Sequence, residues 1–490
     1  MLTTLAFRHL LVRKVRSLFL LLGFSIGVGV MIVLLSVGEA MLEQSRDVSL
    51  VGGGEITVLP LGIDVEAMRT GGIGGLFFGI DRARFVTRQA LGGPRHGDLI
   101  RAVSPVIEGK LLYLRRGDRL VPVRAGGEIP SRAAAVGSGL DVVSGEWKDS
   151  GADSAYFAPT PQQLYDQLDR FHLPASPDST WGEWHYFNIV VSPHEWWYIT
   201  YLIGGLVGVK DSAPGSGRWG GQLLVTHRRP DGRYERFLSN ERASSIQFDT
   251  SRADIRIGGS SVQQRDGKYR LRGTANGNAG AARIEVDLIP APNRYFPPVE
   301  LRDDEFLSGY VVPGLVASAS GRICVARRCR DFSEVPAYHD HNWGVWRNVT
   351  WEWGAAQGRR LAILYGGVYG PERATANTAI RSPFFLAAVD SLGVKQVLRF
   401  DRIEYQGSRS AKGTGSFDSP RQFDLQAVRE RDTLRLHVVV EDALGTELES
   451  NGFRRGFLQM RGRFTLSARL LGQSIADSGK GFFETYVTPR

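Results

Sequence analysis

The sequence predicts an all-β protein, and three observations support that fold class. Apolar and polar residues alternate along residues 283–288 and 434–441, a pattern typical of strands with one solvated face. Turn signals at Pro230-Asp-Gly, Arg265-Asp-Gly-Lys and Leu392-Gly separate such segments and predict hairpins. Segments with a helical period are few after residue 150, so antiparallel barrels or sandwiches are expected there.

Length and composition predict more than one core. The chain has 490 residues, which exceeds what a single hydrophobic core usually holds. Its 59 Gly, 15 Tyr and 24 Phe suit short strands joined by tight turns. The net charge of +9 is compatible with nucleic-acid binding, but no basic run interleaves with aromatic residues, so we expect no nucleic-acid partner.

An uncharged apolar stretch, Leu18–Val37, lies near the N-terminus. As a helix, its roughly 20 residues match the hydrocarbon thickness of a bilayer. Basic residues precede it between positions 8 and 16, whereas Glu39 and Glu43 follow, so the positive-inside rule places residues 1–17 in the cytoplasm. The sequence therefore predicts a transmembrane helix at 18–37 in a single-pass inner-membrane protein whose body lies in the periplasm. A cleaved signal peptide is the alternative.

The first part of the chain resembles the start of a MacB/FtsX-type ABC-transporter permease. The likeness rests on residues 5–28, on Gly54-Glu-Ile-Thr-Val and on Leu140-Asp-Val-Val-Ser-Gly-Glu-Trp. It implies that residues 38–150 form a small α+β extracytoplasmic segment and that permease or ATPase subunits are partners. The chain shows no second spanning stretch and no P-loop, so the resemblance implies a truncated permease segment.

The two cysteines, Cys324 and Cys329, have four residues between them. This spacing can close a short hairpin, and in an oxidising compartment it predicts a disulfide. Two unpaired thiols are the alternative. A zinc site would need further Cys or His ligands at a suitable spacing, and the sequence shows none.

Eight of the ten tryptophans lie in two segments, residues 181–198 and 338–353. Indoles are bulky and their N–H groups need partners when buried, so this concentration exceeds what a β core requires. It predicts an apolar pocket walled by aromatic faces; an aromatic plug that only packs is the alternative. The candidate ligand-binding residues are Trp184, Trp196, Trp197, Tyr338, Asn342, Trp343, Trp351 and Trp353.

Residues 180–488 resemble the AttH-like family, which includes carotenoid 1,2-hydratase (hydroxyneurosporene synthase). The motifs are Glu195-Trp-Trp-Tyr, Tyr338-His-Asp-His-Asn-Trp-Gly, Trp351-Glu-Trp-Gly and Gly479-Lys-Gly-Phe-Phe-Glu-Thr-Tyr. The resemblance implies two tandem lipocalin-like antiparallel β-barrels, expected at 181–346 and 347–490 after a linker at 151–180. Barrels of about eight strands can each hold one small ligand.

Five residues of these motifs are candidates for catalysis: Asp340, His339, His341, Glu195 and Tyr198. Asp340 held protonated by burial, or a histidine cation, could protonate an alkene, and aromatic faces could stabilise the resulting cation. Glu195 could orient the water, and Tyr198 is a further proton donor. In a regular strand the two histidines point to one face and Asp340 to the other, unless the strand bulges.

Each of these residues also has a purely structural interpretation. The histidines and Asp340 could satisfy buried backbone groups near the junction of the barrels. Glu195 could fix a strand end, and Tyr198 could simply pack. Although His-x-His is a metal-ligand pattern, no third ligand is predictable from spacing, so we assign no metal and no cofactor.

Three hypotheses for the function follow. The main one is a membrane-anchored module that binds an apolar lipid or isoprenoid ligand and associates with an ABC-type export system. The alternative is a hydratase or isomerase that adds water to an isoprenoid C=C bond, and the third is a structural adaptor. Whether the protein is an enzyme stays open, because one fold commonly hosts unrelated functions.

Overall fold

The computed structural model describes residues 14–46, 56–58, 80–117, 119–136, 149–151, 169–172, 180–205, 220–250, 252–303, 306–346, 350–369, 384–400, 403–413, 417–450 and 453–487. The predicted linker at 151–180 and the permease-like motif at 140–147 lie mostly outside these residues. The chain divides into two compact units, an N-terminal unit (Met1–Leu91 with Leu99–Phe157) and a C-terminal unit (Gly92–Asp98 with Ala158–Arg490).

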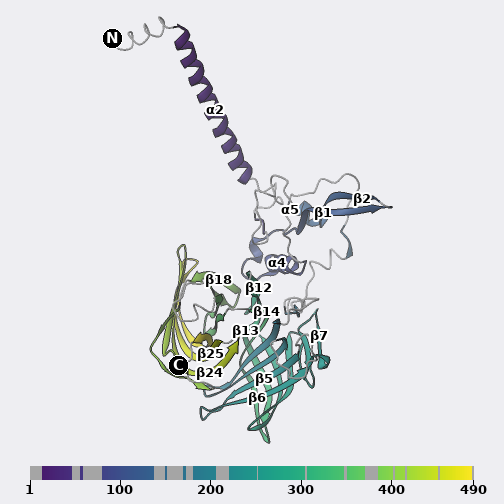
Figure 1. Ribbon diagram of the computed structural model, residues 1–490, viewed down its shortest axis with the longest axis vertical. Helices are drawn as coiled ribbons and strands as arrows, with labels where there is room; N and C mark the ends of the chain where they lie inside the picture. The colour runs from purple at the N-terminus through teal and green to yellow at the C-terminus, as the bar shows by residue number, and fades with distance from the viewer. Residues whose placement is uncertain are drawn as a thin grey trace. The chain divides into compact units, whose positions relative to one another are not determined.

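The N-terminal unit combines helices with one β-hairpin (Figure 1). Its elements are α2 (Lys14–Arg46), α4 (Ile80–Gly92), β1 (Val106–Arg116), β2 (Arg119–Glu128) and α5 (Pro130–Val136), and the 3-10 helix η2 (Gly97–Leu99) follows α4. The strands β1 and β2 pair antiparallel, and the chain turns between them at Gly117, whose φ of 61° favours glycine.

The predicted membrane anchor is wrong. The apolar stretch does form a helix, because residues 18–37 lie within α2. Among the residues that the structure describes, however, no helix is both long enough and apolar enough to cross a bilayer. This finding contradicts the predicted single-pass inner-membrane location with a periplasmic body.

The C-terminal unit holds two large antiparallel sheets. The first contains β3 (Gly182–Ser192), β4 (Glu195–Gly204), β5 (Gly220–Arg228), β6 (Tyr234–Arg242), β7 (Ile246–Asp249), β8 (Asp254–Ile257), β9 (Ser260–Arg265), β10 (Lys268–Gly277), β11 (Gly280–Pro290), β12 (Phe296–Asp303), β13 (Phe306–Val325) and β14 (Arg328–Trp346), with a short 3-10 helix η3 (Ala243–Ser245). The second contains β15 (Thr350–Gly358), β16 (Ala362–Tyr369), β17 (Phe384–Asp390), β18 (Gly393–Phe400), β19 (Ile403–Gln406), β21 (Lys412–Gly413), β23 (Gln422–Arg429), β24 (Asp432–Ser450), β25 (Phe453–Leu470) and β26 (Gln473–Val487), while β20 (Arg409–Ser410) pairs with β22 (Asp418–Ser419).

The first sheet closes into a barrel, which we call the first barrel. Its strands follow the order β11-β13-β14-β3-β4-β5-β6-β10, and β10 pairs with β11 to complete the ring. The alternation predicted for residues 283–288 has its structural cause here, because Ile284, Val286 and Leu288 point into the buried interior while Arg283 and Glu285 are exposed.

The second sheet curls in the same way and forms the second barrel. Its strands follow the order β18-β17-β16-β15-β26-β25-β24-β23-β19. The edge strand β18 approaches β24, because the side-chain amide of Gln396 in β18 donates to the carboxylate of Asp432, the first residue of β24, at 2.6 Å. Leu434, Leu436 and Val438 point into its buried core. The two barrels confirm the predicted all-β fold of tandem lipocalin-like barrels.

The predicted turn signals all connect paired neighbouring strands. Asp266 and Gly267, with φ of 53° and 70°, form the two-residue turn between β9 and β10, a conformation that Asp-Gly adopts readily. Gly232 and Gly393 also have positive φ at the other two turns. These short connections set the register of each hairpin.

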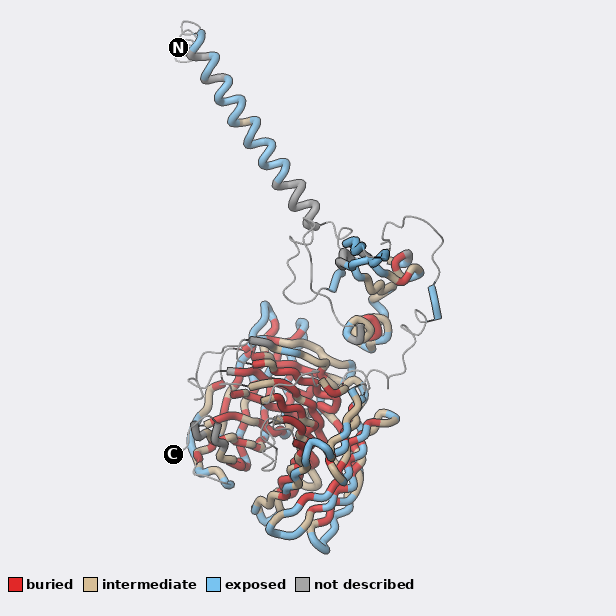
Figure 2. The backbone as a smooth tube through the Cα atoms, turned by 45° about the vertical axis from the view of Figure 1, so that its right-hand side comes forward, coloured by how far each residue is buried: buried red, intermediate tan, exposed pale blue. Residues whose placement is uncertain are grey.

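The two barrels pack against each other through an aromatic layer. Buried residues of β3, β4 and β14, on the outside of the first barrel, form one cluster with residues of β15 and β26. Trp353 of β15 donates its indole N–H to the Tyr338 hydroxyl of β14 at 3.0 Å across this layer. Figure 2 shows how buried residues concentrate along the strands of this unit. We call this region the inter-barrel face.

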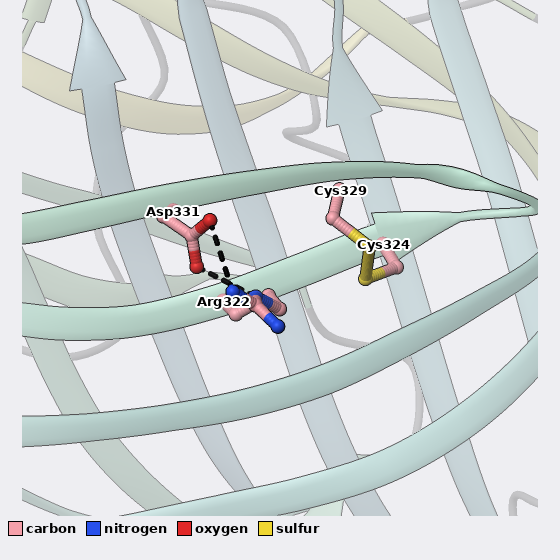
Figure 3. The surroundings of a disulfide bond; sticks show 4 residues. All are labelled: Arg322, Cys324, Cys329 and Asp331. Carbon is pink, nitrogen blue, oxygen red and sulfur yellow. Dashed lines mark hydrogen bonds and ion pairs between the residues drawn. A yellow bond between two sulfur atoms is a disulfide. The ribbon is translucent and has the colours of Figure 1, made fainter.

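The predicted cysteine pair lies at the tip of the β13–β14 hairpin. Cys324 and Cys329 are opposite each other in the register and form a disulfide. Two residues further from the tip, Arg322 and Asp331 form an ion pair at 2.6 Å, as Figure 3 shows. The disulfide therefore closes a loop with a sequence separation of only 5 residues.

Replacing both cysteines by serine should lower the free energy of unfolding by about 2 kcal/mol, because so short a loop removes little entropy from the unfolded chain. Urea titration of the oxidised protein and of the double variant measures the difference. Reduction of the wild type should produce the same change. A loss several times larger would show that the hairpin tip contributes more than loop closure.

Candidate functional site

The strand β14 divides the predicted catalytic residues between two environments. Its first part, residues 328–336, has no buried residue, but from Ala337 to His341 every residue is buried. Because side chains alternate along a strand, Tyr338, Asp340 and Asn342 point to the inter-barrel face, whereas His339 and His341 point into the first barrel. The structure therefore does not bring Asp340 and the two histidines into one site.

Asp340 lies at the inter-barrel face and is 3% exposed. The Tyr338 hydroxyl donates to its Oδ2 atom at 2.7 Å, and the Asn342 side-chain amide donates to its Oδ1 atom at 2.6 Å. The Tyr338 hydroxyl in turn accepts the indole N–H of Trp353. Three residues that the sequence predicted for ligand binding thus hold the carboxyl group in one orientation.

Burial raises the pKa of Asp340 well above its usual range. The hydrogen bonds from Tyr338 and Asn342 oppose this increase, whereas the negative charge of Glu484 adds to it. The net effect favours the neutral carboxylic acid over the carboxylate. A neutral carboxyl group held in apolar surroundings can act as a proton donor.

Aromatic rings surround this carboxyl group. Phe482 of β26 lies with its ring centroid 4.6 Å from that of Tyr338 and 5.8 Å from that of Tyr186. Tyr198 lies 6.0 Å from Tyr186. Burial raises the pKa of Tyr198 to about 12, so this predicted proton donor stays protonated at neutral pH.

A second carboxyl group, Glu484 of β26, lies on the same face. It accepts the indole N–H of Trp351 at 3.4 Å and the side-chain amide of Gln459 at 3.3 Å. Burial raises its pKa to about 7, against an opposing effect of those two hydrogen bonds. The inter-barrel face therefore carries one buried carboxyl group, Asp340, and one half-buried group, Glu484, and the pKa of each is raised.

The other predicted aromatic residues of this face form its margins. Trp184 packs against Trp346 and Trp351, at centroid distances of 4.9 and 6.3 Å. Trp196 lies between two guanidinium groups, at 4.6 Å from Arg228 and 4.8 Å from Arg461. Such cation–π contacts stabilise a buried ring and place positive charge beside it.

Glu195 lies away from this arrangement, on the opposite face of β4 from Tyr198. Its carboxylate pairs with His227 at 3.3 Å and with Arg330 at 3.5 Å. The neighbouring Trp197 stacks on His227 with ring centroids 3.6 Å apart. The structure gives Glu195 and Trp197 ion-pair and packing contacts and shows no contact between Glu195 and Asp340.

Inside the first barrel, His339 and His341 belong to a fully buried polar cluster. Asp169 contacts both rings, at 3.1 Å from Nε2 of His339 and at 2.6 Å from Nδ1 of His341. His341 also contacts Glu183 through Nε2 at 3.0 Å, and His185 lies beside His339 at 3.4 Å. We call Asp169, Glu183, His185, His339 and His341 the histidine cluster.

The histidine cluster concentrates charge in a core where solvent cannot compensate it. Burial alone would lower the pKa of His341, but Asp169 and Glu183 raise it to about 9. Burial drives the pKa of His185 well below its ordinary value. Trp343 lies at the edge of the cluster, stacked on His172 at 3.5 Å, and a side chain on Gly309 would clash with its indole.

Two sets of side chains could hold a metal ion here, Asp169 with His185 and His341, and His172 with Glu183 and His341. Sequence reasoning missed Asp169, His185, Glu183 and Glu484. His185 and Glu183 lie within the first tryptophan segment, and Glu484 lies in the C-terminal motif. Both segments were identified from the sequence, but no role was assigned to these three polar residues. Asp169 has no recognisable local motif.

Fold and site together define a tandem β-barrel protein with a buried acidic face between its barrels. No family model and no curated protein matches the chain. Similar solved structures include a protein assigned as AttH from Nitrosomonas europaea, with 15% identity, a TM-score of 0.41 and coverage of 64% of this chain and 93% of that chain. Kievitone hydratase from Nectria haematococca has 13% identity, a TM-score of 0.40 and coverage of 63% and 89%. CghA with Sch210972 has 9% identity, a TM-score of 0.43 and coverage of 66% and 97%.

At these identities and TM-scores the likeness carries no information on activity. None of the comparisons supports the resemblance of the N-terminal residues to an ABC-transporter permease.

Replacing Glu484 by Gln should make stability less dependent on pH. The folded-state pKa of about 7 lies above the ordinary value of 4.5, so between these values the folded protein keeps a proton that the unfolded chain has released. Wild-type stability falls as pH rises through that window. The variant lacks this loss and should gain roughly 1–3 kcal/mol relative to wild type between pH 4.5 and 8.

Urea titration of both proteins across this pH range measures the effect. Glu285→Gln, an exposed position on β11, is the matched control and should follow the wild type. A constant difference between Glu484→Gln and wild type at all pH values would contradict the assigned pKa.

Proposed function

We propose that the inter-barrel face catalyses the addition of water to a carbon–carbon double bond of an apolar, isoprenoid-like substrate. The observation that carries this proposal is a fully buried carboxyl group, Asp340, kept neutral among aromatic rings. Hydration of an unactivated alkene requires a strong proton donor in a site of low polarity. The motif resemblance to carotenoid 1,2-hydratase supports the same reaction class.

In the first step the Asp340 carboxyl group transfers its proton to one alkene carbon. The π electrons form the new C–H bond, the neighbouring carbon becomes a tertiary cation, and Asp340 becomes a carboxylate. Tyr338 and Asn342 stabilise that carboxylate, because both donate hydrogen bonds to it. The same two contacts orient the acid before the transfer.

The aromatic layer then stabilises the carbocation. The faces of Tyr186, Tyr198, Tyr338 and Phe482 carry negative electrostatic potential, which attracts a cation without trapping it as a nucleophile would. Burial raises the pKa of Tyr186 well above its usual range, which keeps its phenol protonated and unreactive. This arrangement lowers the energy of the short-lived cation.

In the last step a water molecule attacks the cation and forms the C–O bond. The released proton goes to Glu484, whose pKa of about 7 leaves part of the population ionised at neutral pH. Exchange with solvent returns Glu484 and Asp340 to their starting states, so the net reaction consumes one alkene and one water and gives one tertiary alcohol. Two carboxyl groups in one apolar site can divide the roles of acid and base between them.

This proposal replaces our main sequence-based hypothesis by its alternative. The apolar ligand predicted from the tryptophan segments becomes the substrate. Binding without turnover has no separate support in the site. The predicted association with permease and ATPase subunits likewise has no support among the described residues and is not part of the proposal.

Purified protein should convert an acyclic isoprenoid alkene, such as squalene or lycopene, to a tertiary alcohol. In water enriched with oxygen-18 and deuterium, the product should carry one labelled oxygen and one deuterium on the adjacent carbon, as mass spectrometry can show. Asp340→Asn should lower the rate by about 10²- to 10⁴-fold, because the amide cannot donate this proton.

The matched control is Asp424→Asn, which changes a half-exposed carboxylate paired with His437 on the second barrel. It should retain wild-type activity, and the circular dichroism spectrum of both variants should match that of the wild type. If a panel of isoprenoid alkenes is bound but recovered unchanged from the wild type, or if Asp340→Asn is as active as the wild type, the proposed reaction is wrong.

A further inference from the structure

Three imidazole rings of the histidine cluster come from two paired strands. His339 and His341 are two residues apart on β14, and His185 lies directly opposite His341 on β3. All three point into the first barrel and are 0% exposed. The alternation of side chains along β14 and the pairing of β14 with β3 thus bring three imidazole rings together, and no loop residue is needed.

Three of the four inward-facing groups have separations that suit a small cation, and Nδ1 of His341 lies 2.6 Å from Oδ1 of Asp169. Nδ1 of His185 lies 3.4 Å from Nε2 of His339, which lies 3.1 Å from Oδ2 of Asp169. The His185 nitrogen is 3.9 Å from the same oxygen. Tetrahedral zinc with bonds of about 2.0–2.1 Å places its ligand atoms roughly 3.3 Å apart.

Two of the three histidines have the outward partners that metal-bound histidines require, whereas Nε2 of His185 is buried with no hydrogen-bond partner. Nδ1 of His339 donates to the backbone carbonyl of Tyr186 at 3.0 Å, and Nε2 of His341 donates to Glu183 at 3.0 Å. Each partner accepts the ring proton, which leaves a lone pair on the inward nitrogen. The Tyr269 hydroxyl donates to Asp169 at 2.6 Å and orients the carboxylate in the same way.

These hydrogen bonds leave an electrostatic conflict in the middle of the cluster. When Nδ1 of His339 donates to Tyr186, its inward Nε2 lone pair faces Oδ2 of Asp169, which is also an acceptor, and His341 lies between two carboxylates although a neutral imidazole has only one N–H. Repulsion between acceptors in a fully buried core is costly, and only added protons or a cation can remove it. A single divalent cation balances the charges of Asp169 and Glu183 while leaving all three histidines neutral.

We infer that Asp169, His185, His339 and His341 bind one divalent transition-metal ion of the zinc type inside the first barrel. Three imidazoles and one carboxylate match the ligand preference of zinc, and four protein ligands leave no open position. Complete burial of all four residues is typical of a structural site. The ion connects β3, β14 and the segment 169–172, and it lies behind the strand that carries Asp340 on its other face.

The metal content of the purified full-length protein tests this inference. Cells grown with added zinc should yield about one zinc ion per chain by elemental mass spectrometry, after dialysis against buffer without metal. His185→Gln and Asp169→Asn should each reduce this content at least tenfold. His227→Gln is the matched control, because His227 is a buried histidine of the same barrel that pairs with Glu195 and Glu235.

Cobalt provides a second measurement that needs no variant. Wild-type protein produced in cobalt-supplemented medium should show the intense visible absorption of tetrahedral cobalt with nitrogen and oxygen ligands, and extended incubation with zinc should abolish it. This test also covers the case in which the variants fail to fold.

Metal content below about one tenth of an ion per chain under both growth conditions would overturn the inference and leave a proton-linked hydrogen-bond network. An equal loss in His227→Gln would also overturn it. Since no substrate is needed, failure here is distinct from failure of the proposed hydration reaction.

Discussion

The structure depends on one constraint, the burial of β14 on both of its faces. A strand at a barrel surface ordinarily keeps one face in solvent, and no residue in the first half of β14 is buried. From Ala337 onward the second barrel covers the outer face, so polar residues on both sides need partners within the protein. Tyr338 and Asn342 supply them for Asp340, while Asp169 and Glu183 supply them for the histidines.

Local periodicity was sufficient to predict much of this arrangement. The two-residue repeat predicted the strands at 283–288 and 434–441 and the opposite orientation of Asp340 and the two histidines. The turn signals predicted the hairpin turns. The cysteine spacing placed the pair at a hairpin tip, where the structure has a disulfide. Each of these features depends on residues close together in the sequence, where strand geometry and turn chemistry dominate.

Features that depend on long-range pairing could not be predicted. Asp169 meets His341 across 172 positions, and Trp353 and Glu484 come from the second barrel, so no spacing rule links them to Asp340. Glu195 shares a motif with Tyr198, yet strand alternation sends the two side chains to opposite faces. The anchor prediction failed differently: residues 18–37 do form a helix, but no helix among the described residues is both long and apolar enough to cross a bilayer.

The two faces of β14 also act on each other electrostatically. The charge of His341 lowers the pKa of Asp340, even though their side chains point in opposite directions, because only the thickness of one strand separates them. Glu484 acts in the opposite direction from the second barrel. Burial therefore has the largest effect on the proton affinity of the proposed acid, and the charges of Glu484 and His341, one from each barrel, change it in opposite directions. A divalent ion in the histidine cluster would add positive charge behind Asp340 while making His341 neutral, so the first barrel can tune the acid at the inter-barrel face without contacting it.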